Sequence, residues 1–308
     1  MIVCPLCGSD SSRVIYDCRD VPPRINTLAG MIHQCTDCQF LYKESTQQSL
    51  NALEEIYQYT IKETEFYFGP VLKGYDENSA EIRLYSYVLE EIHRRIGPAT
   101  NSEQRLLDVG CATGAMLDQS RAFGFTPYGV ELNPNFARYA REEFGIPVIA
   151  GELNVEHFES ESFAAITMID LIEHVPDPLG LLNTARQLLR PDGLLVVYTP
   201  NHRSLIVQLS LALYHLTGGR IRTPADTVFG TNHVCFFDHV TLPVALRRTG
   251  YTVDAVHRIK YDPGHQGEVS DQSGMAIGLK ALETFSQLIG LPYRLLAFAH
   301  KPAKIDEG

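Results

Sequence analysis

From Arg105 onward, the hydrophobic positions of the chain form short apolar runs separated by longer amphipathic stretches. The short runs have the length of buried strands, and the stretches between them repeat their apolar positions as helices do. This alternation predicts an α/β fold in which a mostly parallel sheet is covered on both faces. The expected strands span Arg105–Val109, Thr126–Glu131, Ile146–Ala150, Phe163–Ile169, Gly193–Thr199, Tyr251–Ile259 and Tyr293–Ala299.

Helices are expected before the first strand and after each of the first five. Upstream of the sheet, Ile82, Tyr85 and Leu89 begin a series of apolar positions at steps of three and four, which predicts an amphipathic helix over residues 78–96. The helix after the second strand is expected to begin at Asn133-Pro134, because asparagine caps a helix well and proline suits its first turn.

Residues 202–235 form a long insertion between the fifth and sixth strands. The run from Ser204 to Leu216 is very apolar, and Gly218-Gly219 ends it. A helix of that length spans about 20 Å, which is too short to cross a bilayer. We therefore expect a lid over the substrate end of the sheet. A contact helix of a homodimer and a helix lying at a lipid interface are the alternatives.

Length and composition allow one large domain and a smaller one, since the chain has 308 residues and is 44% hydrophobic. The N-terminus has no basic segment followed by an apolar run, so a cytoplasmic location is expected. The formal net charge of −11 argues against a surface that follows a phosphate backbone. Nucleic acid is therefore not an expected partner.

Four cysteines near the N-terminus lie in two Cys-x-x-Cys motifs, Cys4-Pro5-Leu6-Cys7 and Cys35-Thr36-Asp37-Cys38. Each motif presents two thiolates on one tight turn, and two such turns complete a tetrahedral zinc site, so residues 1–45 are predicted to be a zinc ribbon. Because four protein ligands leave no position for water, the zinc should be structural. A redox pair is the competing interpretation. The remaining cysteines are expected to be small apolar residues: Cys18, Cys111 and Cys235.

The ribbon is a poor candidate for binding phosphate, because its acids outnumber its bases. Residues 46–100 should form a helical connector or substrate flap, and residues 101–308 the catalytic domain. The connector is rich in aromatic residues that pack a linker against its domain or stack on a planar substrate. They are Tyr57, Tyr59, Phe66, Tyr67, Phe68 and Tyr75.

A glycine turn, Asp108-Val109-Gly110-Cys111-Ala112-Thr113-Gly114, ends the first expected strand. Glycine lets the backbone approach a ligand closely because it has no Cβ. The second strand ends in Glu131, which is placed to accept hydrogen bonds from a ribose diol. These features predict a nucleoside cofactor. A nicotinamide cofactor is less suitable, since its turn reads G-x-G-x-x-G and Asp108 would repel a pyrophosphate. The carboxylate suits a ligand that carries an ammonium and a sulfonium.

The same turn resembles motif I of the class I S-adenosylmethionine (SAM)-dependent methyltransferases, with Ala112 in place of the middle glycine. Further segments resemble this family: Gly151-Glu152-Leu153, Leu189–Leu195, Thr199-Pro200-Asn201 and His233–Phe237. The resemblance implies a seven-stranded Rossmann-like sheet and SAM as the cofactor. The implied cofactor contacts are Asp108, Gly110, Gly114, Glu131, Leu132, Glu152, Leu153, Ile169 and Asp170.

The segment Asp170–Pro178 follows the fourth strand, beside the point where the strand order should reverse and where open α/β sheets bind ligands. It resembles the Glu-x-x-Glu-His segment of the ubiquinone-biosynthesis O-methyltransferases. On a helix, Asp170, Glu173 and His174 would share one face and bind a divalent cation such as Mg²⁺, which would polarise an acceptor hydroxyl. The alternative is a capping box formed by Asp170 and Glu173, with His174 in the wall of the cofactor pocket.

Together these features predict a SAM-dependent methyltransferase that acts on a hydroxyl of a small molecule, such as a quinone precursor, a sugar or a secondary metabolite. The chemistry needs alignment of the reactants, exclusion of water and one proton acceptor. The candidate bases are His174, His202 and His233, because imidazole titrates near neutral pH. Two alternatives are an rRNA base methyltransferase, which would need a basic cleft, and a protein that binds SAM without turnover.

Overall fold

A computed structural model gives the fold of residues 3–19, 28–44, 80–97, 104–259 and 274–303. The aromatic connector expected over residues 46–75 lies outside the described residues. Among the described helices, none combines the length and the hydropathy that a bilayer span requires.

The predicted α/β sheet is confirmed. Its strands are ordered β10-β11-β8-β7-β4-β5-β6. The five strands from β8 to β6 run parallel to one another, whereas β11 is antiparallel to both β8 and β10. The strands are β4 (Arg105–Val109), β5 (Thr126–Glu131), β6 (Val148–Ala150), β7 (Phe163–Ile169), β8 (Leu189–Pro200), β10 (Thr252–Ile259) and β11 (Arg294–His300).

The fifth strand is longer than predicted, because β8 begins at Leu189 and not at Gly193. Of the residues predicted to form a turn, Leu189 pairs with Phe163, and the register then shifts so that Leu194 pairs with Ala165. Asp192 lies among the extra residues of this irregularity. It has a φ of 58°, a left-handed conformation that aspartate tolerates better than most residues.

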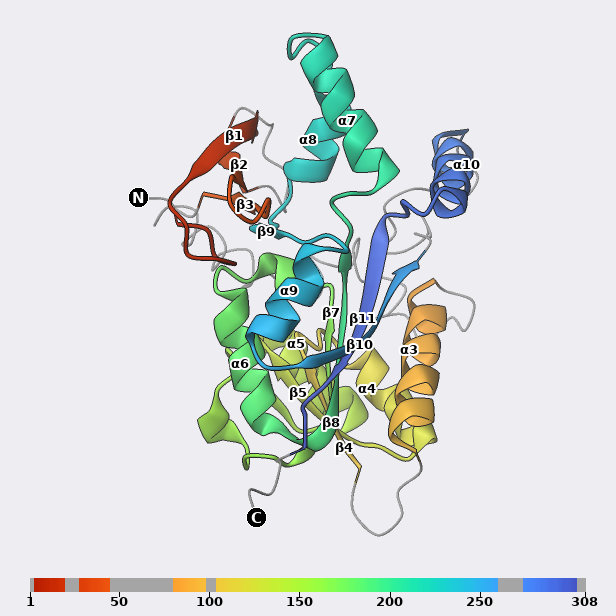
Figure 1. Cartoon of the computed structure of the whole chain (residues 1–308). Coiled ribbons are helices and arrows are strands. Elements are labelled where there is room, and N and C mark those ends of the chain that lie inside the picture. The colour runs from red at the N-terminus through yellow and green to blue at the C-terminus, as the bar shows by residue number, and fades with distance from the viewer. Residues whose placement is uncertain (1–2, 20–27, 45–79, 98–103, 260–273, 304–308) are drawn as a thin grey trace.

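Two helical layers cover the sheet (Figure 1). One packs α3, α4 and α5 on apolar side chains such as Leu106 and Val196, and the other packs α6 and α9 on side chains such as Ile166 and Val197. The helices are α3 (Ala80–Ile96), α4 (Ala115–Ser120), α5 (Pro134–Phe144), α6 (Pro178–Leu188), α9 (Thr241–Arg248) and α10 (Gly274–Leu288), with single 3-10 turns η1 (Arg121–Phe123), η2 (Val155–His157) and η3 (Ile172–His174).

The helix starts were partly predicted. Asn133 caps α5, and its side chain accepts hydrogen bonds from the backbone N–H groups of Asn135 and Phe136. The helix expected after the third strand is wrong, because β6 is followed only by the single turn η2. The Asn154 side chain satisfies the N–H of Glu156 there, and the chain then returns to the sheet at Phe163.

The N-terminal ribbon does not end at its own sequence. Its antiparallel sheet has the order β1-β2-β3-β9, and β9 belongs to the insertion after β8. The expected domain bounds at residue 45 and at residues 202–235 therefore cut through one sheet. The elements are β1 (Ser12–Asp17), β2 (Met31–Cys35), β3 (Leu41–Lys43), α7 (Leu205–Leu216), α8 (Thr223–Phe229) and β9 (Cys235–Phe236).

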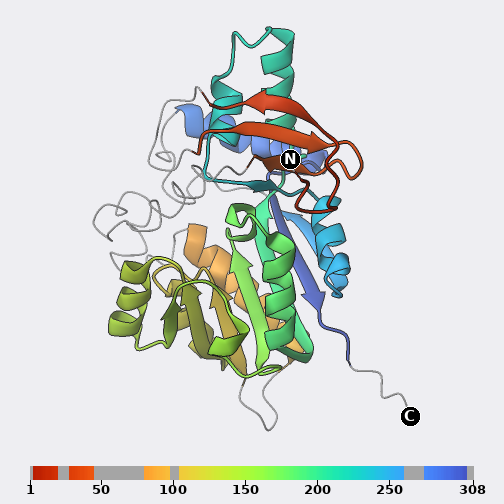
Figure 2. The same cartoon turned by 90° about the vertical axis from the view of Figure 1, so that its left-hand side faces the viewer.

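A shared core joins the ribbon to the insertion. Tyr16 and Ile32 of the ribbon are buried with Val207, Phe229 and Phe236 of the insertion. The Tyr16 ring lies 5.4 Å from that of Phe229, and its hydroxyl donates to a carboxylate oxygen of Asp226. The ribbon is thus packed into the larger domain, above the end of the sheet where β8 leads into α7 (Figures 1 and 2).

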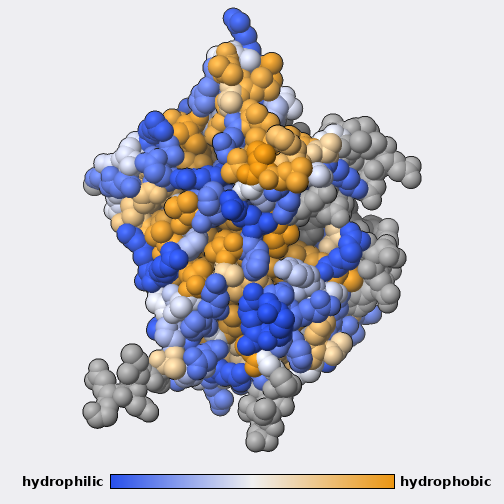
Figure 3. Space-filling model, turned by 45° about the vertical axis from the view of Figure 1, so that its right-hand side comes forward, coloured by the Kyte–Doolittle hydropathy of each residue, from blue (hydrophilic) through white to orange (hydrophobic). Residues whose placement is uncertain are grey.

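The apolar helix of the insertion forms as predicted, with the Ser204 hydroxyl accepting from the Val207 N–H at its start. Its outer face stays exposed at Leu209, Leu213 and Leu216, and Phe285 and Leu288 of α10 are exposed as well. Figure 3 shows apolar surface on the part of the molecule formed by α7 and α10. A lid role and a homodimer contact for α7 both stay predictions.

Candidate active site

The glycine turn after β4 has a left-handed backbone conformation at three positions. Gly110, Ala112 and Gly114 have φ values of 75°, 46° and 84°. A Cβ on Gly110 would lie 2.9 Å from the Leu171 side chain, and one on Gly114 would lie 2.9 Å from Ala140 Cβ. Both positions therefore require glycine. Ala112 occupies the middle position of the motif at a cost of roughly 1–2 kcal/mol, because a left-handed φ strains a residue with a Cβ.

Glu131 holds this strained turn from the end of β5. One carboxylate oxygen accepts from the Ala112 N–H and the other from the Asn133 N–H, both at 2.8 Å. Burial raises the pKa of Glu131, and these backbone donors oppose the shift. A carboxylate has about four acceptor positions, so each oxygen can still accept a hydrogen bond from a ribose hydroxyl.

Asp108 is buried at the carboxyl end of β4. Its Oδ1 accepts from the Thr167 hydroxyl of β7 at 2.6 Å. Burial raises the pKa of Asp108 to about 7, the Thr167 hydrogen bond lowers it, and the nearby charge of Glu131 raises it further. Two carboxyl groups thus face one site, and a cationic ligand would favour their ionised forms.

Asp108→Asn should stabilise the ligand-free protein at higher pH. Asp108 keeps its proton up to about pH 7 in the fold and only to about 3.8 in the unfolded chain. The folded state therefore binds more protons between these values, and stability falls as pH rises. Asparagine removes this cost, so Tm should rise by a few degrees at about pH 8 and little at about pH 4.

Thermal melts of the ligand-free protein at the two pH values measure this. Asp10→Asn, in an exposed position of the ribbon, is the control and should leave Tm unchanged at both. A fall in Tm of Asp108→Asn at the higher pH would contradict the assignment of a buried, unfavourable charge.

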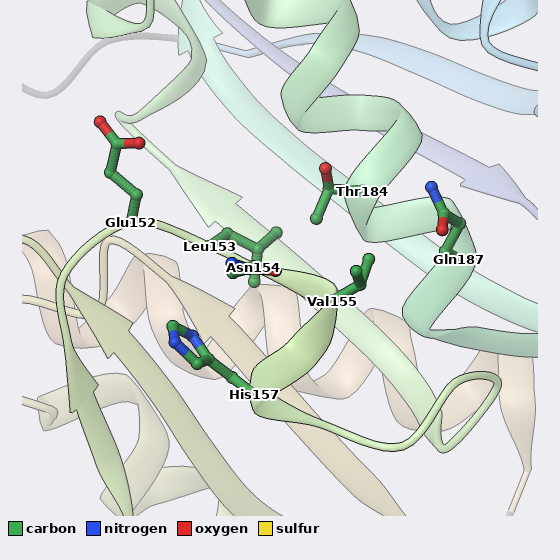
Figure 4. A pocket seen from close by; sticks show the side chains of 7 residues that line it. All are labelled: Glu152, Leu153, Asn154, Val155, His157, Thr184 and Gln187. Carbon is green, nitrogen blue, oxygen red and sulfur yellow. The ribbon is translucent and has the colours of Figure 1, made fainter.

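The other expected cofactor contacts lie around the same edge. Leu132 is 40% exposed beside Glu131, and Ile169 is half-buried at the end of β7. Glu152 and Leu153 line an open depression of about 410 Å³ that reaches Thr184 and Gln187 of α6 (Figure 4). Neither Glu131 nor the glycine turn lines this depression.

The expected face of Asp170, Glu173 and His174 is wrong. Asp170 has a left-handed φ of 49°, and η3 begins only at Ile172 and has a single 3-10 turn. The Asp170 carboxylate pairs with Arg294 of β11 and is not among the groups whose ligand atoms come together with those of Glu173 and His174. The capping box is wrong as well, because Leu171 precedes the turn and provides no side-chain cap.

His233 takes the place expected for Asp170. One ligand atom from each of Glu173, His174 and His233 lies within 4.8 Å of the others. Glu173 is fully buried, and its Oε2 accepts from the Thr199 hydroxyl at the end of β8 at 2.9 Å. Glu173 Oε1, His174 Nδ1 and His233 Nδ1 have no hydrogen-bond partner within the described part of the chain.

The three expected bases converge, although they are spread over sixty residues of sequence. The ring of His233 lies 4.7 Å from that of His174 and 6.3 Å from that of His202. His202 Nδ1 lies 3.3 Å from the Phe237 carbonyl oxygen, which can only accept, so Nδ1 carries the hydrogen and Nε2 is the acceptor.

Burial sets the charge of this group, which we call the histidine cluster (His174, His202, His233). It lowers the pKa of His174 and of His202 to about 4, and it lowers that of His233 well below its usual value. Burial also raises the pKa of Glu173 to about 8, with the charge of Asp170 adding to the shift. At neutral pH the imidazoles are therefore neutral and can accept a proton.

The four cysteines of the Cys-x-x-Cys motifs come together as predicted. Cys4 Sγ lies 3.6 Å from Cys38 Sγ, and Cys7 Sγ lies 3.5 Å from Cys35 Sγ. All four sulfur atoms lie within 4.8 Å of one another. Four thiolates at about 2.3 Å from a tetrahedral zinc ion would be about 3.8 Å apart, so this arrangement fits the metal.

The sequence of residues 81–256 matches the family model of the methyltransferase domain. The chain belongs to this methyltransferase family. The matched family and the fold make the protein a SAM-dependent methyltransferase. The matched segment begins within α3, so this helix is part of the methyltransferase domain.

Curated relatives of this methyltransferase include two ubiquinone biosynthesis O-methyltransferases. The protein from Xanthomonas axonopodis pv. citri (strain 306) is 29% identical over 182 residues, which cover 57% of this chain and 72% of the relative. That from Actinobacillus pleuropneumoniae serotype 5b (strain L20) is 32% identical over 108 residues, which cover 32% of this chain and 46% of the relative. The second match spans about half of the relative's length.

Solved structures agree with the fold of this methyltransferase. A protein from Galdieria sulphuraria, proposed to be a sarcosine dimethylglycine methyltransferase, has a TM-score of 0.53 at 17% identity, covering 73% of this chain and 88% of its own. Geranyl diphosphate C-methyltransferase from Streptomyces coelicolor A3(2) has a TM-score of 0.50 at 20% identity, covering 71% of this chain and 77% of its own. At these identities the likeness concerns the fold alone.

Three polar partners at the methyltransferase site were not predicted from the sequence. Thr199 binds Glu173, Arg294 pairs with Asp170, and Lys43 of the ribbon reaches the insertion. Arg294 could have been suspected, because an arginine at the start of an otherwise apolar strand needs a partner when buried. No local pattern marks Thr199 or Lys43.

Proposed function

We propose that this methyltransferase transfers the methyl group of SAM to a hydroxyl oxygen of a small-molecule acceptor. The observation that carries the proposal is the histidine cluster beside Glu173. It brings neutral imidazoles to the carboxyl edge of the sheet, next to the glycine turn, and one nitrogen of each has no hydrogen-bond partner among the described residues. The contact of Leu171 with Gly110 joins the two parts of the site.

In this proposal SAM lies across the carboxyl ends of β4 and β5. Glu131 accepts from the ribose hydroxyls, and Asp108 faces the cationic end of the cofactor. Gly110 and Gly114 allow the backbone to approach. The remaining proposed cofactor contacts are those expected from the sequence: Leu132, Glu152, Leu153 and Ile169. Asp170 pairs with Arg294 and would affect the cofactor only through that pair.

The reaction needs little covalent help from the protein. The acceptor oxygen attacks the methyl carbon, the carbon–sulfur bond breaks, and S-adenosylhomocysteine leaves with the bonding electrons. The hydroxyl proton passes to an imidazole nitrogen of the histidine cluster, of which His233 is the central member. Glu173 is buried beside His174 and His233, and the ionised form of its carboxyl group would stabilise the imidazolium by attraction of opposite charges.

The acceptor class follows from the relatives and from charge. The curated relatives are named for ubiquinone biosynthesis, so a catechol of a quinone precursor is the first acceptor to test, followed by sugars and secondary metabolites. The net charge of −11 gives no support to an RNA substrate. Turnover would exclude a role limited to binding SAM.

The metal proposals differ for the two clusters. We propose a structural zinc ion at Cys4, Cys7, Cys35 and Cys38, because the four sulfur atoms fit tetrahedral coordination. Magnesium at the second cluster is not part of the proposal, since one carboxylate with two imidazoles is not the oxygen-rich donor set that magnesium prefers.

His233→Gln is expected to lower kcat by about 10²–10⁴-fold, the usual contribution of a general base. SAM affinity should stay within about twofold, because Glu131 and the glycine turn are unchanged. The rate of S-adenosylhomocysteine release during methylation of the catechol protocatechuate measures kcat. His257→Gln, an exposed histidine on β10, is the matched control and should be active.

Two results would oppose the proposed function. The first is a His233→Gln enzyme with normal kcat whose His174→Gln and His202→Gln counterparts are also normal. The second is methylation of RNA by the wild-type protein under conditions in which catechols and sugars are not methylated.

A further inference from the structure

Lys43, the last residue of the ribbon strand β3, is a buried cation that links the ribbon to the insertion. The side chain is 2% exposed in a region of apolar residues. Its ammonium donates to the carbonyl oxygens of Leu28 at 2.8 Å, Phe229 at 3.0 Å and Thr231 at 2.7 Å. Leu28 belongs to the ribbon, whereas Phe229 and Thr231 belong to the insertion.

This arrangement is costly for a residue that only fills space. A buried ammonium loses its hydration, and carbonyl dipoles replace that loss only in part. Burial accordingly lowers the pKa of Lys43 to about 8. An apolar side chain would fill the same volume without this cost, so the three donated hydrogen bonds point to a role in setting the conformation of the chain that they hold.

That chain leads directly to His233. Residues 231–234 belong to no helix or strand, so no ladder of backbone hydrogen bonds fixes them. Lys43 holds them on both sides of His233. Its ammonium binds the Thr231 carbonyl, and its backbone N–H donates to the Val234 carbonyl at 2.8 Å. The Val234 N–H in turn donates to the Glu173 carbonyl at 2.8 Å.

We propose that Lys43 is a positioning residue for methyl transfer, which holds His233 against Glu173 and His174 and so makes the ribbon a part of the catalytic unit. The inference rests on the proposed role of the histidine cluster. Lys43 itself lies behind the loop and acts through His233. Loss of its ammonium leaves the Thr231 carbonyl with only the longer hydrogen bond from the Leu28 N–H, at 3.3 Å, and lets the His233 ring move relative to Glu173.

Lys301 offers a matched control. It is also a buried lysine, at 7% exposed, and its ammonium donates to the Leu189 carbonyl at 2.8 Å and to Glu161 at 3.0 Å. It follows β11, and its ammonium lies beside the start of β8, at the opposite end of the sheet from the histidine cluster. Replacing either lysine by methionine removes a buried charge, but only Lys43 contacts the His233 loop.

The first experiment compares Lys43→Met and Lys301→Met in the full chain. Misplacement of a reacting group by about 1 Å lowers the reaction rate by about a hundredfold. We therefore expect kcat with protocatechuate to fall tenfold to a hundredfold in Lys43→Met. Its SAM affinity should stay within about twofold of that of wild type, and its zinc content should equal that of wild type. Lys301→Met should keep kcat. Equal loss of kcat in both variants, or normal kcat in Lys43→Met, would overturn the proposal.

A double variant shows whether Lys43 acts through His233. If it does, Lys43→Met combined with His233→Gln should be as slow as His233→Gln alone, because the loop then has no base to position. Multiplied losses would overturn the proposal, since they would mean that Lys43 acts independently of His233.

A readout without an acceptor separates this inference from the proposed function. Acylation of histidines by diethyl pyrocarbonate, followed by mass spectrometry of peptides, measures how freely each ring is reached. His233 should react several times faster in Lys43→Met than in wild type, whereas His257 should react equally in both. Unchanged reactivity of His233 would overturn the positioning role. Absence of turnover in the wild-type protein would instead count against the proposed function.

Discussion

Glu131→Gln is expected to weaken SAM binding by about a hundredfold or more. The carboxylate lies at the end of β5 with one acceptor position free on each oxygen, after the Ala112 and Asn133 N–H groups are satisfied. A hydrogen bond to a charged group contributes about 1.5–3 kcal/mol, so losing charge-assisted bonds to two ribose hydroxyls costs about 3 kcal/mol or more. Isothermal titration with SAM measures the change in Kd.

The same substitution also acts on the turn. Glutamine keeps only one oxygen, so either Ala112 or Asn133 loses its acceptor, and the strained Ala112 conformation is held less firmly. Glu142→Gln makes the same chemical change at an exposed position of α5 and should leave Kd unaltered. A Glu131→Gln protein that binds SAM as tightly as wild type would remove Glu131 from the cofactor site.

The parts of the site that follow from the sequence are those encoded locally. A glycine turn between a strand and a helix leaves few conformations, and Ala112 adopts a left-handed φ because Gly110 and Gly114 fix the turn on either side. Likewise, Glu131 ends a strand whose alternation is plain, so its position at the carboxyl edge follows from the predicted sheet.

Pairings between distant segments could not be predicted in the same way. β3 and β9 are two short strands separated by almost two hundred residues, and neither has a sequence pattern that identifies the other as its partner. Asp170 was assigned to a helix face because its spacing from Glu173 and His174 fits one. In the structure the Asp170 carboxylate pairs with Arg294 of β11, and Asp170 has a left-handed φ, so it does not share a helix face with Glu173 and His174. His233, from the insertion, lies beside these two residues instead.

These long-range pairings change what the ribbon is expected to do. Taken alone, residues 1–45 predict a separate module whose zinc ion serves only its own stability. In the fold, the ribbon sheet continues into β9, and the segment before β9 carries His233. The four-cysteine cluster and the histidine cluster are therefore connected through the paired strands β3 and β9, while the proposed SAM site lies on β4 and β5.

Cys35→Ser should therefore remove zinc and slow catalysis while SAM binding survives. Cys35 is fully buried at the end of β2, 3.5 Å from Cys7 Sγ. Structural zinc contributes about 10 kcal/mol or more to the folding of a small zinc module, so loss of one thiolate should release the metal and loosen β2 and β3. Through β9 the loss should lower kcat tenfold or more, by the same misplacement of His233 that Lys43 prevents.

Cys18→Ser is the matched control for this experiment. Cys18 is equally buried in the ribbon, but its Sγ lies 2.9 Å from the Gly30 carbonyl oxygen, an interaction that a serine hydroxyl can replace. Zinc content by elemental analysis and SAM affinity by titration distinguish the variants. Cys18→Ser should keep its zinc. If Cys35→Ser also keeps one zinc ion per chain, the four-cysteine site is wrong. If it loses zinc but keeps full kcat, the ribbon is a separate module after all, and the path through β9 does not carry catalysis.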